Sequence, residues 1–134
     1  MRPVAFLLAF AAACAPLAPP PGDVTHPPPV RLEATQPSGG AVRLTLVNES
    51  AAAVGYNLCQ SRLQRRSGRD WTPVQTGEVC TMELRSLPPG QRAIFDKTLP
   101  PALPAGEYRY VTSVETPAGT PQRVLASQSF TVGR

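Results

Sequence analysis

Residues 108–114 read Tyr-Arg-Tyr-Val-Thr-Ser-Val, the longest stretch of alternating side chains in the sequence. Tyr108, Tyr110 and Val114 fall on one parity, and Arg109 falls on the other. Successive side chains of a strand point to opposite faces of its sheet, so this period of two predicts a strand with one buried face. The segment indicates a β-protein, and the sequence on either side repeats the pattern.

Further segments of alternating character are bounded by Gly, Pro, Asn or Ser. We expect strands at 30–34, 42–46, about 54–64, 71–74, 79–87, 92–98 and 123–132. With 108–114 they make seven or eight short strands at spacings near a dozen residues, and none of the segments carries a convincing helical stripe. This pattern predicts an all-β domain over residues 30–134, an antiparallel β-sandwich, with a small barrel as the alternative.

Several short segments resemble the immunoglobulin-like domains of bacterial envelope and secreted proteins. They are Leu-Thr-Leu-Val-Asn-Glu-Ser at 44–50, Tyr56, Trp71 after a charged hairpin, Leu-Pro-Pro-Gly-Gln at 87–91 and Pro-Ala-Gly-Glu-Tyr-Arg-Tyr at 104–110. The resemblance covers about residues 30–134 and implies an immunoglobulin-like antiparallel β-sandwich of about seven or eight strands. It implies a fold and no activity, because one fold hosts many functions. The cysteines do not flank Trp71 as in antibody domains, so the domain is not of the antibody type.

The first residues predict an export signal. Arg2 is followed by an apolar run of ten residues at 4–13, which is too short to span a bilayer but suits the core of a signal peptide. The small residues Ala-Ala-Ala at 11–13 stand directly before Cys14 and resemble the lipobox of bacterial lipoproteins, although Ala11 replaces the usual Leu. The resemblance implies a signal peptide over 1–13 and a lipidated Cys14. The alternative is an ordinary secretory signal with Cys14 incidental, which makes the protein secreted.

A proline-rich linker follows over residues 14–29. Seven of the 17 prolines lie between positions 16 and 29. Proline lacks an N–H and restricts the residue before it, so this segment favours an extended spacer of about 3.1 Å per residue, roughly 45 Å at full stretch. A tether directly after a cysteine suits a domain anchored in the cell envelope. Ala15 is not the Asp that tends to retain lipoproteins in the inner membrane, so the resemblance favours the outer membrane where the cell has two.

Cys59 and Cys80 remain for a bridge if Cys14 carries lipid. Export places them in an oxidising compartment, where a disulfide is the default. Closing a loop of about 22 residues contributes about 3 kcal/mol in the loop-entropy model. A redox pair or half of a metal site is the weaker alternative, because there is no Cys-x-x-Cys spacing and the single histidine, His26, lies in the linker. We expect no metal and no cofactor.

Four arginines, Arg62, Arg65, Arg66 and Arg69, lie within eight residues. As a basic hairpin tip they are a candidate surface for anionic head groups, lipopolysaccharide phosphates or acidic glycans. The alternative is an ordinary solvated hairpin. Nucleic acid is not expected as a partner, because the protein is exported and this segment lacks interleaved aromatic residues.

The sequence predicts no catalytic residues and no enzyme. Asp70 and Asp96 are isolated carboxylates, and a Ser–Lys pair through Lys97 is left open without any motif to support it. We expect a non-enzymatic envelope lipoprotein that contacts the membrane through its lipid and an envelope protein or surface polymer through its immunoglobulin-like domain. The alternatives are a proteinase inhibitor that presents the Leu-Pro-Pro-Ala-Leu-Pro loop at 99–104, and an assembly accessory that donates an edge strand.

Overall fold

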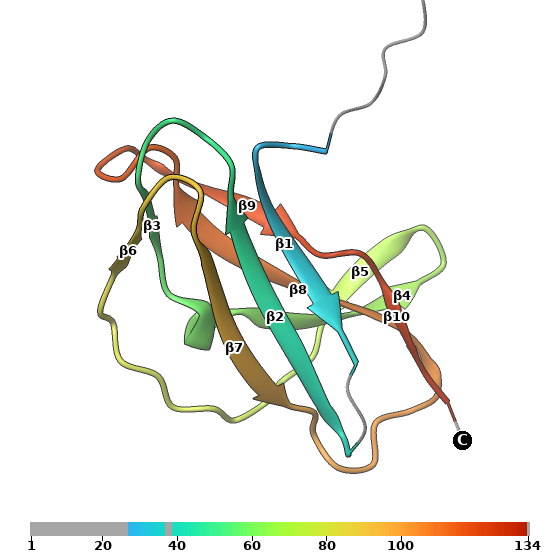
Figure 1. The fold of residues 1–134 in the computed structure, drawn as a ribbon. Coiled ribbons are helices and arrows are strands. Elements are labelled where there is room, and N and C mark those ends of the chain that lie inside the picture. The colour runs from blue at the N-terminus through green and yellow to red at the C-terminus, as the bar shows by residue number, and fades with distance from the viewer. Residues whose placement is uncertain (1–26, 37–38, 134) are drawn as a thin grey trace, which may run out of the picture.

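The computed structural model describes residues 27–36 and 39–133, which form an all-β sandwich of two antiparallel sheets (Figure 1). The three-stranded sheet has the order β1 (Val30–Thr35), β2 (Ala41–Asn48), β7 (Arg92–Thr98). The seven-stranded sheet has the order β5-β4-β8-β3-β6, and β9 and β10 also pair with β8. Its elements are β3 (Val54–Tyr56), β4 (Arg62–Ser67), β5 (Asp70–Pro73), β6 (Arg85–Leu87), β8 (Gly106–Glu115), β9 (Gln122–Ala126) and β10 (Phe130–Val132). The arrangement is compatible with an immunoglobulin-like domain.

Strand β8, which contains the alternating segment 108–114, is the central strand of the larger sheet. One edge of β8 pairs with β3 and β4, and the other pairs with β9 and β10. Tyr108, Tyr110 and Val114 are fully buried, and both tyrosine rings stack on Phe130 with centroid distances of 6.4 and 6.0 Å. The predicted parity of this strand is confirmed.

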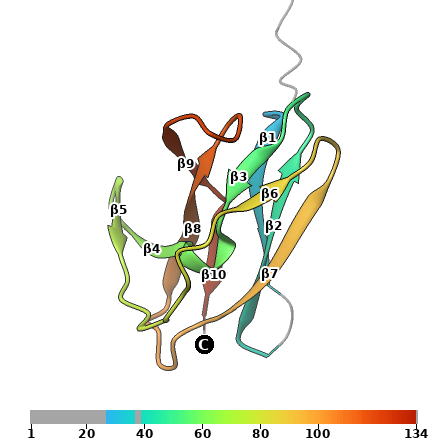
Figure 2. The same ribbon diagram turned by 90° about the vertical axis from the view of Figure 1, so that its left-hand side faces the viewer.

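The core lies between the two sheets, which Figure 2 shows almost edge-on. Apart from β5, each strand contributes side chains of one parity to this core, as expected where one face of a sheet is buried. The largest aliphatic side chains of the core are buried almost completely, and each contributes roughly 1.5–3 kcal/mol through removal of apolar area from water. The buried aliphatic residues of the core cluster are Val30, Leu32, Ala34, Val42, Leu44, Leu46, Val54, Leu58, Leu63, Leu87 and Val114.

The described residues form ten strands, more than the seven or eight expected, because two predicted strands each divide. The segment 54–64 is interrupted by a 3₁₀ turn, η1 (Leu58–Gln60), which turns Leu58 into the core. The segment 123–132 divides at Ser127, whose hydroxyl accepts the N–H of Tyr110 at 3.1 Å. The register on β8 shifts by one residue there, which is the effect of a bulge.

The expected strand at 79–87 is wrong over most of its length, since only β6 (Arg85–Leu87) is a strand. Val79 and Met82 project into solvent, so neither parity of this segment finds a buried face. Residues 74–84 instead form an irregular connection that passes from β5 to β6.

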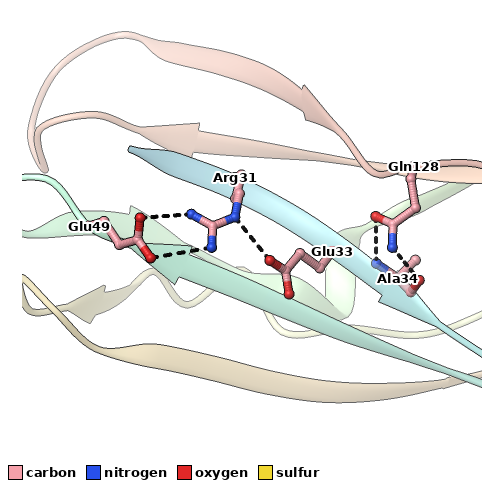
Figure 3. A network of polar contacts seen from close by, with 5 residues as sticks. All are labelled: Arg31, Glu33, Ala34, Glu49 and Gln128. Carbon is pink, nitrogen blue, oxygen red and sulfur yellow. Dashed lines mark hydrogen bonds and ion pairs between the residues drawn. The ribbon is translucent and has the colours of Figure 1, made fainter. Parts of the chain in front are cut away.

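The free edge of β1 is covered by the side chain of Gln128, which lies in the connection between β9 and β10 of the larger sheet. Glu49 N–H donates to Pro29 O at 2.7 Å, so in this antiparallel ladder the odd-numbered residues of β1 bond to β2. The N–H and C=O of the even-numbered Ala34 therefore point away from β2. Both groups bond to the Gln128 amide, with N–H to Oε1 at 3.2 Å and Nε2 to O at 2.8 Å (Figure 3). Gln128 therefore occupies the place of a neighbouring strand.

The outer face of the three-stranded sheet is charged. Arg31 forms ion pairs with Glu33 at 2.9 Å and with Glu49 at 3.0 Å (Figure 3). Further along the same face, Arg43 on β2 pairs with Asp96 on β7 at 2.8 Å. Opposite charges in register on neighbouring strands support this pairing of β2 with β7.

Candidate functional site

Strand β7 is one of the two edge strands of the three-stranded sheet, and it pairs with β2 on one side (Figure 2). Leu99 N–H donates to Gly40 O at 2.9 Å, and Asn48 N–H donates to Gln91 O at 3.1 Å. In an antiparallel ladder these two bonds fix the parity, so the odd-numbered residues of β7 bond to β2 and the even-numbered ones point the other way. The outward-facing set is Arg92, Ile94, Asp96 and Thr98.

The outward N–H and C=O groups of β7 are open. Within residues 27–36 and 39–133, no backbone or side-chain group forms a hydrogen bond with them. At seven residues, β7 is longer than β1 or any other edge strand of this part of the chain, and it contains no proline. Sheet edges are normally shortened, covered or interrupted, and Gln128 covers the edge of β1 in this way. An uncovered edge of the length of β7 is therefore suited to pairing with another strand.

Apolar side chains gather beside this edge. Ile94 is 60 % exposed on the otherwise charged outer face, and Phe95 is 37 % exposed on the inner side. Next to them lies a groove of about 340 Å³, which we call the edge groove. Its apolar and disulfide lining consists of Tyr56, Leu58, Cys59, Val79, Cys80, Ile94 and Phe95.

The predicted disulfide between Cys59 and Cys80 is confirmed, with a Cα–Cα distance of 5.8 Å. The elements that it joins differ from the expectation of two strands. It ties η1 to the irregular segment 74–84, and so fixes the far wall of the edge groove. The bridge takes the place of the ladder hydrogen bonds that this segment lacks.

Lys97 lies on the buried parity of β7 and is only 1 % exposed. Its ammonium donates to Cys59 O at 2.7 Å and to the Glu78 carboxylate. It also lies 5.9 Å from the ring centroid of Phe95 and 6.0 Å from that of Tyr110. Burial raises the pKa of the Tyr110 hydroxyl far above its usual range, and the Glu78 carboxylate raises it further. None of the hydrogen bonds of Lys97 in the described chain is to a serine, so the Ser–Lys pair gains no support.

The structure does not gather the four predicted arginines into one patch. Side chains of Arg62 and Arg66 leave the outer face of β4, roughly 13 Å apart along the strand. Arg65 has the opposite parity and donates to Ala105 O at 3.2 Å. Arg69 lies in the exposed turn between β4 and β5.

Trp71 organises the outer face of the larger sheet instead. The guanidinium of Arg109 lies 4.4 Å from its ring centroid and that of Arg66 lies 5.8 Å away. Arg66 also forms an ion pair with Glu107 at 3.3 Å, which reduces its availability to an external anion. Arg109 was not among the site residues predicted from the sequence, although its outward parity next to Tyr108 was a usable signal.

Cys14, the predicted signal peptide and most of the predicted linker lie outside the described residues. No helix in the described ranges is long and apolar enough to cross a membrane. The same part of the chain contains no group of three or more His, Cys, Asp or Glu side chains placed to hold a metal ion. No family model, curated protein or solved structure matches this chain.

Proposed function

We propose that this protein is a non-enzymatic lipoprotein of the cell envelope whose sandwich domain binds protein by adding a partner strand to β7. The observation that supports binding is the open seven-residue edge beside an apolar groove. The lipid anchor at Cys14, and an outer-membrane location where the cell has two membranes, rest on the sequence pattern of residues 1–29.

Strand addition uses both features of this site. Main-chain hydrogen bonds to the outward groups of β7 supply affinity, and the groove receives alternate side chains of the added strand. Apolar side chains at those positions bury Ile94 and Phe95, which are exposed in the single chain. The partner is therefore an extended segment with apolar side chains opposite Ile94 and Phe95.

A proteinase inhibitor acting through the loop 99–104 receives less support. Leu99 and Leu103 pack against the core, and Pro104 O accepts the hydroxyl of Tyr108 at 2.6 Å. The two leucines are thus half-buried against the core, which disfavours their entry into the specificity pockets of a protease. A surface polymer held by the four arginines receives less support, because Arg65 has the opposite parity to Arg62 and Arg66 on β4, and Arg66 already pairs with Glu107.

The anchor is tested by the intact mass of the mature protein extracted from membranes. We expect a chain that begins at Cys14 and carries acyl groups, with two thiols appearing only after reduction. A chain without acyl groups overturns the anchor and makes this a secreted protein.

Protein binding is tested by placing a photoreactive phenylalanine analogue at Phe95 in the full chain, in membranes of the native host. We expect one defined protein adduct, identified by mass spectrometry, that is lost when Ile94→Pro removes an outward N–H. The matched control is Val124→Pro: Val124 is 58 % exposed against 60 % for Ile94 and also projects from an edge strand. No protein adduct, or an adduct equally sensitive to both prolines, overturns the use of the β7 edge.

A further inference from the structure

Resting on the proposed use of the β7 edge, we infer that the strand which pairs with it is β7 of a second copy of this chain. The two three-stranded sheets then become one continuous sheet across a two-fold axis that passes beside Ile94. A two-fold axis makes the strands antiparallel and requires the edge to be complementary to itself. The sequence of β7 meets this requirement.

The charges of β7 are placed symmetrically about Ile94. Arg92 and Asp96 lie two residues before and after it, and all three have their N–H and C=O groups on the open edge. In the register centred on Ile94, Arg92 of each copy lies opposite Asp96 of the other, and the two Ile94 side chains face each other. Asp96 also pairs with Arg43 of its own copy, so its carboxylate lies between two guanidinium groups in the dimer. Opposite charges and apolar pairs across an antiparallel ladder are both stabilising.

Neighbouring registers lose this complementarity. Centring the pair on Phe95 places Ile94 opposite Asp96, and centring it on Ala93 places Arg92 opposite Ile94. Centring it on Asp96 places two carboxylates directly opposite each other, which is destabilising. The register on Ile94 is therefore selected by the side chains and not only by the backbone.

The inner parity of the strand fits the same register. Phe95 of one copy lies opposite Ala93 of the other, so a large ring faces a small side chain. Ala93 is half-buried at the rim of the core, and Phe95 lines the edge groove. Pairing covers both and supplies two hydrogen bonds for each of the three outward residue pairs.

The assembly closes at two copies. Each copy uses its β7 edge once, and the opposite edge of the same sheet is covered at Ala34 by Gln128. The buried charge of Lys97 begins where the paired segment ends, and an inward-pointing charge discourages extension of strand pairing. An isologous contact of this kind gives a dimer and not a fibre.

The contact is small, so we expect a weak dimer in solution, with a dissociation constant on the order of 10 µM to 1 mM. Confining copies to one membrane surface raises their effective concentration and favours pairing there. Sedimentation velocity of the full chain over about this concentration range measures the equilibrium. We expect dimers for the natural sequence and for Val124→Pro, and monomers for Ile94→Pro.

A charge exchange tests the register itself. Arg92→Glu and Asp96→Lys each place like charges opposite in a self-dimer, and each weakens it at least about tenfold. An equimolar mixture of the two variants restores dimers, because every pair in the mixed dimer again joins unlike charges. Circular dichroism confirms that each variant is folded.

Monomers of the natural sequence throughout this range overturn the dimer, as does a dimer that survives Ile94→Pro or a mixture that fails to associate. If the chain is monomeric while the probe at Phe95 still captures another protein in an Ile94-dependent manner, the dimer fails and the proposed function stands. If the probe captures nothing and no dimer forms, both fail.

Discussion

Replacing Glu78 by Gln removes the carboxylate that contacts the buried ammonium of Lys97. The ammonium then keeps Cys59 O, at 2.7 Å, and at best a neutral amide oxygen in place of the carboxylate, so its positive charge has no counter-charge. Removing one partner of a buried ion pair costs about 3–5 kcal/mol, because the remaining charge stays desolvated. The side chain of Glu78 is 30 % exposed, so water reaches this site and the lower value, about 3 kcal/mol, applies. This is a large share of the roughly 5–15 kcal/mol that stabilises a domain.

The variant Lys97→Met is the matched comparison. It keeps an unbranched side chain on the buried parity of β7, removes the charge and leaves Glu78 free to turn towards water. The cost is the unpaired Cys59 O, about 1 kcal/mol. In the Lys97→Met background, Glu78→Gln then costs close to nothing, so the two positions are coupled by about 3 kcal/mol.

Urea unfolding at pH 7 measures the four free energies, with the fluorescence of Trp71 as the probe. Trp71 lies against Arg109 and Arg66 on the outer face of the larger sheet, whereas Lys97 lies on the buried parity of β7 in the other sheet, so the Trp71 signal reports unfolding of the whole domain. If Glu78→Gln costs the same with and without Lys97, the ion pair does not stabilise the fold and the reasoning is refuted.

Three further predictions concern other parts of the fold. The double variant Cys59→Ser, Cys80→Ser lowers the free energy of unfolding by about 3 kcal/mol, since the bridge spans 21 positions. Reduction of the natural protein before urea unfolding gives the same loss of stability, and an unchanged free energy of unfolding contradicts this prediction. Asn48→Ala costs about 2–3 kcal/mol in thermal unfolding, because the buried amide donates to two backbone carbonyls; a cost below about 0.5 kcal/mol contradicts it. The Arg43 guanidinium, through its hydrogen bonds, lowers the pKa of Asp96, so the ionised carboxylate stabilises the fold above its unfolded pKa and this stability is lost as pH falls below about 4. Arg43→Gln therefore makes the fall in unfolding free energy between about pH 5 and 2 shallower, and an unchanged slope contradicts this prediction.

Much of the fold follows from local pattern. The parity of 108–114 is a property of a few adjacent residues, and this strand forms where the alternation predicts it. The strand expected at 92–98 also forms within its predicted bounds. The disulfide is also predictable, because two cysteines remain in the expected exported domain once Cys14 is assigned to lipid. The break at Ser127 and the turn at η1 were not predictable, since each depends on contacts with a strand elsewhere in the chain.

The candidate site was predicted less well than the fold. Clustering along the sequence suggested one basic surface, but alternation along β4 separates Arg65 from Arg62 and Arg66. The open edge of β7 was not selected, although the accessory that donates an edge strand was among the expected alternatives. Ile94 and Phe95 look like ordinary strand residues until the neighbours of β7 are known.

The sequence by itself determined that this is an all-β domain with two cysteines available for a bridge, because periodicity and cysteine content are written in the order of residues. The tertiary structure decided for the sandwich over the barrel. Only the tertiary structure decided that β6 pairs with β3 and not with β7, which leaves one long edge open beside a groove. It also decided that Lys97 meets Glu78. Side-chain parity is set by the two peptide units around a residue, whereas the neighbour of a strand is set by which distant segments pack together, and that choice is made by the whole chain.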